Sequence, residues 1–142
     1  MRDPRYVFAA VALALVATAC SGEHASNGAG TAPPATGAVA VGAAAEAVLG
    51  LCEIAADHAD DHATAEAVFH DRSHETLHTI AAAVEEVDRA VAADLLTAKQ
   101  RVEADLASDA LPAGFARDVD ALLSATTQAL EAIGVAVPPC PA

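Results

Sequence analysis

The longest stretch without a helix breaker sets the strongest limit on what this chain can fold into. Between residues 43 and 111 the sequence has no proline and a single glycine, Gly50. Alanine, leucine, glutamate and arginine dominate this stretch, and all four have high intrinsic helix propensity. We therefore predict an all-α fold for residues 43–142.

Apolar side chains at helical spacing predict where the first helix lies. A stripe at steps of three and four residues predicts a helix over 43–66: Val48, Leu51, Cys52 and Ala55. Residues 68–71 then predict a turn, because Asp71 or Ser73 can cap the helix that follows.

The remaining apolar residues predict two more helices. A second helix is predicted over 72–108 from a stripe of nine residues: Leu77, Ile80, Ala81, Val84, Val87, Val91, Leu95, Val102 and Leu106. Pro112 and Gly114 predict the next turn, and a third helix over 115–133 ends at Gly134. Because short connections make neighbouring helices antiparallel, we expect an up-down-up three-helix bundle with one long central helix.

The first 20 residues have the features of an export signal. Arg2 and Arg5 form a short charged region, and residues 7–16 are apolar but too few to span a membrane. Small residues then lead into a cysteine, in the order Ala17-Thr18-Ala19-Cys20. This segment resembles the bacterial lipobox, in which cleavage before the cysteine follows attachment of a diacylglycerol to its sulfur. Ala17 departs from that motif, which usually has leucine at this position.

The lipobox resemblance covers residues 1–22 and implies a division of the chain into three parts. Residues 1–19 are expected to be a signal peptide, and Cys20 to carry the lipid that holds the protein on the extracytoplasmic face of the cell membrane. Residues 20–42 are small, polar and rich in glycine, which predicts a flexible tether, so that 43–142 form the domain. The alternative is an ordinary secretory signal in which Cys20 is incidental.

The charge of the chain excludes one class of partner. Twenty acidic side chains against seven basic ones give a net charge of −13. Such a surface repels phosphate backbones, so we expect no nucleic-acid binding through a basic patch.

Two cysteines beyond Cys20 predict a disulfide between Cys52 and Cys140. An even pair in an oxidising compartment indicates a bond. Cys52 lies 17 residues before residue 69, about 25 Å along a helix, and the third helix carries the tail to a similar height. The bond would contribute about 4 kcal/mol in the chain-entropy model.

Histidines form the one cluster that supports a functional hypothesis. Five of the six lie within 21 residues: His58, His62, His70, His74 and His78. The pairs His58/His62 and His74/His78 each have i,i+4 spacing, which puts two imidazoles on one face of a helix. With a turn at 68–71, the two pairs lie at similar height on facing arms. We predict that they share a metal ion, with His70 as a replacement or fifth ligand.

Acidic residues around the histidines fit the same hypothesis. Four carboxylates are expected to orient the imidazoles, with at least one in contact with a histidine nitrogen: Asp57, Asp61, Asp71 and Glu75. Imidazole suits Zn, Cu(II) and Ni. Cu(I) is disfavoured, because the chain beyond residue 19 has no methionine and its thiols are expected to be oxidised.

These features predict a lipid-anchored domain that binds a divalent transition metal as a scavenger, chaperone or sensor. The alternative is a structural or interaction lipoprotein that docks on a cell-envelope partner and has no metal site. We do not expect an enzyme. The Glu-x-x-His spacing of Glu75 and His78 occurs in di-iron bundles, but that design needs a second copy on another helix.

Overall fold

The computed structural model describes residues 39–141, which form helices and no strands. Six helical segments follow one another: α1 (Val41–Asp57), α2 (His62–Val68), η1 (Phe69–His74), α3 (Glu75–Glu85), α4 (Arg89–Leu106) and α5 (Phe115–Ala132). The π-helical η1 joins α2 to α3 without a break, so these three segments make one long helix. The predicted all-α class is confirmed.

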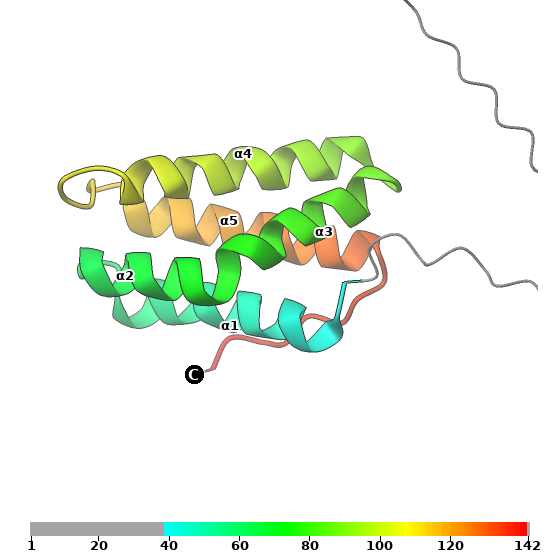
Figure 1. Cartoon of the computed structure of the whole chain (residues 1–142), viewed down its shortest axis with the longest axis horizontal. Helices are drawn as coiled ribbons and strands as arrows, with labels where there is room; N and C mark the ends of the chain where they lie inside the picture. The colour runs from blue at the N-terminus through cyan, green and yellow to red at the C-terminus, as the bar shows by residue number, and fades with distance from the viewer. Residues whose placement is uncertain (1–38, 142) are drawn as a thin grey trace, which may run out of the picture. The chain divides into compact units, whose positions relative to one another are not determined.

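The described residues form an antiparallel bundle of four helices: α1, the long α2–η1–α3 helix, α4 and α5 (Figure 1). The long helix packs against α1 and α4, and α5 closes the bundle between α4 and α1. The core lies between the helices and includes the largest fully buried apolar side chains: Phe69, Phe115, Leu51, Ile54, Leu77, Ile80, Leu95, Leu122 and Leu130. The expected three-helix arrangement therefore differs from the structure, because the first expected turn lies ten residues earlier and a further break at residues 86–88 divides the expected second helix. The expected turn at Pro112 and Gly114 is confirmed, since residues 107–114 separate α4 from α5.

The first break lies ten residues earlier than predicted. α1 ends at Asp57, and residues 58–61 connect it to α2. Asp61 caps α2, since its carboxylate accepts hydrogen bonds from the backbone N–H and the hydroxyl of Thr64. These two hydrogen bonds lower the pKa of Asp61. The predicted turn at 68–71 was wrong, because these residues continue the long helix.

The spacing of buried residues explains why the long helix contains a π-helical segment. Its core row advances in steps of four: Ala65, Phe69, Ser73 and Leu77. In an α-helix of 3.6 residues per turn, each such step drifts by about 40° around the axis. A π-helical turn holds more residues and returns the row to the core. Ser73 then donates a hydrogen bond to the carbonyl of Ala47 in α1, at 3.0 Å.

The second break interrupts the helix predicted over 72–108. Residues 86–88 leave the helix, and the Asp88 carboxylate accepts hydrogen bonds from the backbone N–H groups of Ala90 and Val91 to start α4. Val87 is 65% exposed, although it was expected in the buried stripe. The break turns α4 back along α3, which brings residues near 100 beside residues near 75 (Figure 1).

The end of the last helix and the disulfide agree with the prediction, whereas the direction of that helix does not, since α5 runs back toward the start of α1 (Figure 1). Gly134 has a φ of 72° and follows the end of α5, where a left-handed residue lets the chain leave the helix. The tail then runs back along α1 (Figure 1). The disulfide between Cys52 and Cys140 is confirmed, with Cα atoms 5.5 Å apart.

The predicted signal peptide (1–19), Cys20 and most of the 20–42 tether lie outside the described residues. The first helix begins slightly earlier than predicted, since α1 starts at Val41. Within residues 39–141, none of the helices combines the length and the apolar character needed to cross a membrane.

Candidate metal site

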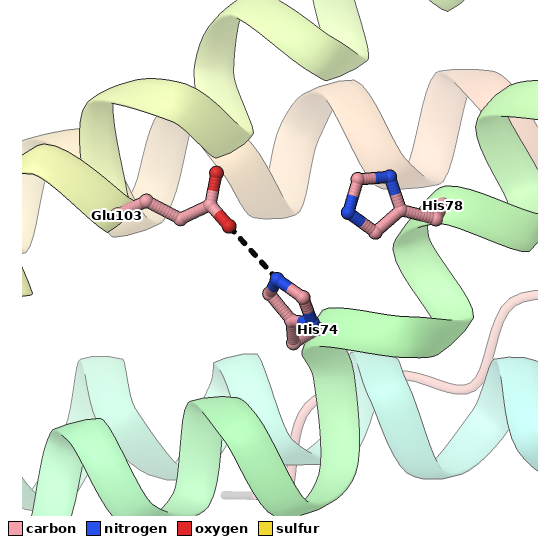
Figure 2. A group of neighbouring side chains, drawn as sticks. All are labelled: His74, His78 and Glu103. Atoms are coloured by element: carbon pink, nitrogen blue, oxygen red, sulfur yellow. Dashed lines mark ion pairs between the residues drawn. The ribbon is translucent and has the colours of Figure 1, made fainter.

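Two histidines of the long helix and one glutamate of α4 converge on a common point (Figure 2). His74 ends η1, His78 lies one turn later in α3, and Glu103 comes from α4. One imidazole nitrogen of each histidine and one carboxylate oxygen of Glu103 all lie within 4.8 Å of one another. The side chains of His74 and Glu103 are 29% and 33% exposed, and His78 is exposed, so solvent ions can reach the group.

The His74 ring is held on two sides. Its Nε2 lies 2.9 Å from Oε1 of Glu103 and donates a hydrogen bond to this carboxylate (Figure 2). The His74 and His78 rings meet edge to face with centroids 5.1 Å apart. His70 extends the row on the other side, also with centroids 5.1 Å from His74, and is exposed.

Lys99 contacts this cluster through Glu103. Its Nζ donates a hydrogen bond to the same Oε1 of Glu103 at 2.6 Å, and its side chain is only 2% exposed. Burial raises the pKa of the Glu103 carboxyl, but the hydrogen bond and charge of Lys99, together with His74, outweigh this effect. The net pKa of Glu103 is lowered, so its carboxylate is ionised at neutral pH.

Two imidazole nitrogens and a carboxylate oxygen are a donor set that zinc takes in proteins, with a fourth position left for water or another ligand. Donors about 2.0–2.1 Å from a tetrahedral ion lie roughly 3.4 Å apart. The atoms of His74, His78 and Glu103 therefore need to close by about 1.5 Å at most, which small side-chain rotations achieve.

The other histidine pair has different partners. His58 lies in the connection between α1 and α2, where its Nε2 is 3.6 Å from Oε1 of Glu53. The carboxylate of Glu53 also binds Arg72. His62 begins α2, and its Nε2 lies 2.8 Å from the carbonyl oxygen of Leu106, to which it donates. Both imidazoles therefore hold connections at the ends of helices.

The two predicted pairs do not meet, because they do not lie on facing arms. His62 and His74 are on the same long helix, 12 residues apart, which is roughly 18 Å at the α-helical rise. His58 lies before that helix begins. The structure thus brings together His74 and His78, with His70 beside them, and separates His58 and His62 from this group.

The four carboxylates predicted to support the histidines lie elsewhere. Asp57 ends α1, Asp61 caps α2, Asp71 is exposed in η1, and Glu75 is exposed at the start of α3. Among the side chains that the structure describes, no hydrogen bond or ion pair joins these carboxylates to an imidazole nitrogen. The carboxylates that do so are Glu53 and Glu103.

The sequence prediction did not include Glu103 and Lys99. In one helix over 72–108, Glu103 would lie nearly 40 Å from His78, at 1.5 Å per residue. The signal that was available is Asp88, a good N-cap residue in the middle of the predicted helix. A break at that point folds the i,i+4 pair Lys99/Glu103 back onto the histidines.

Comparison of the chain with protein-family models, curated proteins and solved structures finds no match. The convergence of His74, His78 and Glu103 is therefore the feature from which a function can be inferred.

Proposed function

We propose that this protein is a cell-envelope lipoprotein, anchored through Cys20, whose helical bundle binds one divalent transition metal ion. The ligands are His74, His78 and Glu103. The observation that carries the proposal is the convergence of their donor atoms within 4.8 Å from two different helices. This donor set suits Zn, Cu(II) and Ni.

The electrostatics of the chain support a cation as the ligand. The net charge of −13 attracts cations to the protein surface. The Glu103 carboxylate stays ionised because its pKa is lowered. A neutral imidazole with a free nitrogen lone pair is the form of histidine that binds metal, so binding at His74 replaces its hydrogen bond to Glu103.

The open geometry favours a role in exchange over a structural role. Structural zinc sites have four protein ligands, whereas three protein ligands leave one position for an incoming group. The exposure of His78 leaves that position accessible from solvent. We therefore propose a scavenger, chaperone or sensor of the metal ion.

Calorimetric titration of the full-length chain in mild detergent, after removal of metals with a chelator, tests this proposal. We expect one of Zn, Cu(II) or Ni to bind at one equivalent with sub-micromolar affinity. The double variant His74→Gln/His78→Gln should lose this binding. The matched control His58→Gln/His62→Gln removes two imidazoles with the same sequence spacing and should keep it.

The opposite result would be weak uptake without defined stoichiometry, or equal loss of binding in both double variants. Either outcome removes the proposed site, since it assigns the binding to surface histidines in general.

One observation favours a second candidate, a structural or interaction lipoprotein that docks on an envelope partner. Oε1 of Glu103 already accepts hydrogen bonds from Lys99 and His74, so the cluster also works as a polar contact between η1 and α4. In that case His74→Gln lowers the melting temperature of the chain, and no metal raises it.

The anchor is tested separately. If Cys20 carries the lipid, Cys20→Ala should release the protein from the membrane fraction or block its maturation. Membrane association and processing that are unchanged in this variant would contradict the lipoprotein assignment.

A further inference from the structure

We infer that Lys99 is a built-in competitor of the metal ion, which keeps the site weak enough to release its metal. This inference depends on the proposed function, because it concerns the same three ligands. Lys99 is the only lysine in the chain.

The position of Lys99 is unusual for its side chain. Lysine almost never becomes fully buried unless it is paired. Here the side chain is 2% exposed, and its Nζ lies 2.6 Å from Oε1 of Glu103. Lys99 and Glu103 are four residues apart on α4, so the helix itself holds them together.

The ammonium group of Lys99 therefore occupies one of the places where a cation binds to the Glu103 carboxylate. A metal ion held by this carboxylate lies within a few ångströms of the ammonium, and two positive charges at that distance repel each other. Burial strengthens this repulsion, because solvent screens buried charges less than exposed ones. Metal binding then requires Lys99 to move away or to share the carboxylate.

The same pairing stabilises the site without metal. Lys99 and His74 satisfy Oε1 of Glu103, so the contact between η1 and α4 persists when no ion is bound. A site that is satisfied in both states releases its ion at a lower cost in stability than one that unfolds without it. Lys99 thus makes the site suited to transfer or sensing.

Zinc titration of the full-length chain and three variants tests the inference. Lys99→Met keeps the length of the side chain but removes its charge, and we expect it to bind zinc about tenfold more tightly or better. Lys99→Arg keeps the charge and should bind like the unmodified chain. Arg101→Met removes an exposed charge two residues away on α4 and should also leave the affinity unchanged.

A spectroscopic measurement covers the case in which Lys99→Met fails to fold. Because Lys99 is the only lysine, a chain labelled with ¹⁵N-lysine gives one Nζ signal. Saturation with zinc should shift or broaden this signal. A signal that stays unchanged while zinc binds would overturn the inference.

The titration separates failure of the inference from failure of the proposed function. If the unmodified chain binds zinc and Lys99→Met binds with equal or lower affinity, Lys99 does not compete, and the metal site stands. If neither binds, both proposals fail. If only Lys99→Met binds, and Glu103→Gln abolishes that binding, Lys99 competes so strongly that the native chain is not a metal protein.

Discussion

The two histidine pairs have the same spacing in the sequence and different roles in the structure. His74 and His78 share one uninterrupted helix and face Glu103 of α4. His58 and His62 lie on either side of a helix start, and each has its own partner at a helix end. In this chain the i,i+4 spacing brings two imidazoles together with a third donor only where one helix carries both histidines and a neighbouring helix supplies a carboxylate.

The largest expected effect tests whether the His74/His78 site keeps its metal affinity when the α1 side of the bundle, next to His58, is destabilised. Cys52→Ser/Cys140→Ser removes the bond between α1 and the C-terminal tail, which closes a separation of 88 residues. In the chain-entropy model the bond contributes about 4–5 kcal/mol to the free energy of unfolding. We expect a large loss of stability in denaturant titrations and unchanged metal affinity under conditions in which the variant stays folded.

Metal affinity that falls together with stability in this variant would contradict the comparison. It would mean that the contact between α3 and α4 depends on the covalent link between α1 and the tail.

The second prediction compares two glutamates that contact histidines. Glu103→Gln removes a charged ligand and should weaken metal binding about 100-fold, or roughly 2.7 kcal/mol. Glu53→Gln removes the carboxylate that faces His58 and Arg72, and should leave metal affinity unchanged. Competition with a metal indicator dye measures both. A similar loss in the two variants would show that overall charge, not coordination, controls binding.

The third prediction concerns stability without metal. His62→Ala removes the hydrogen bond to the Leu106 carbonyl and should destabilise the domain by about 1 kcal/mol. His78→Ala, at an exposed position, should change the free energy of unfolding of the metal-free protein by less than about 0.5 kcal/mol. Urea titrations of the two variants check the difference. A larger cost for His78 would assign it a structural role.

The smallest effect comes from Asp105, a carboxylate on α4 that faces the like charge of Asp118 as well as the opposite charge of Arg117. Asp105 follows Glu103 by two residues on α4, and its Oδ2 is buried without a hydrogen-bond partner. Burial, and then the charge of Asp118, raise the pKa of Asp105. Asp105→Asn should therefore stabilise the domain at pH 7 by a few tenths of a kcal/mol, about 0.3, because Arg117 offsets part of the repulsion.

The pH dependence of the two carboxylates has opposite sign. For Asp105, whose pKa is raised, the stabilising contribution is present below its ordinary value of 3.8 and is lost as pH rises through the raised value. For Glu103, whose pKa is lowered, the contribution is present above its ordinary value of 4.5 and is lost as pH falls through the lowered value. Melting curves at pH 3 and pH 7 should therefore show a gain for Asp105→Asn only at pH 7.

Sequence patterns predicted the helical class, most of the core and the disulfide. Buried apolar stripes are local and periodic, so Leu51, Leu77 and Leu95 could be placed without knowledge of the tertiary structure. The disulfide was predictable because the expected domain has two cysteines, which an oxidising compartment would join. The path to it differs from the prediction, because the break at 86–88 makes α5 run opposite to α1 and the tail then returns along α1 to Cys52.

The breaks and the site depend on competition between local signals. Asp61 and Asp88 each cap a helix inside a stretch that propensity alone assigns to one continuous helix. Residues buried at steps of four continue across 68–71, and there the helix continues in place of the predicted turn. Because the turn lies ten residues earlier than predicted, His62 and His74 are on the same helix and His58 lies before it. The predicted pairing of His58 and His62 with His74 and His78 is therefore absent.

The burial of the only lysine also determines how the folded chain meets proteases. A protease that cleaves after lysine has one target in the whole sequence, the bond between Lys99 and Gln100. That bond lies inside α4, and the Lys99 side chain that such an enzyme must bind is buried. Cleavage therefore reports the opening of α4. Because Cys52 and Cys140 lie on opposite sides of the cut, the two fragments stay linked until a reducing agent separates them.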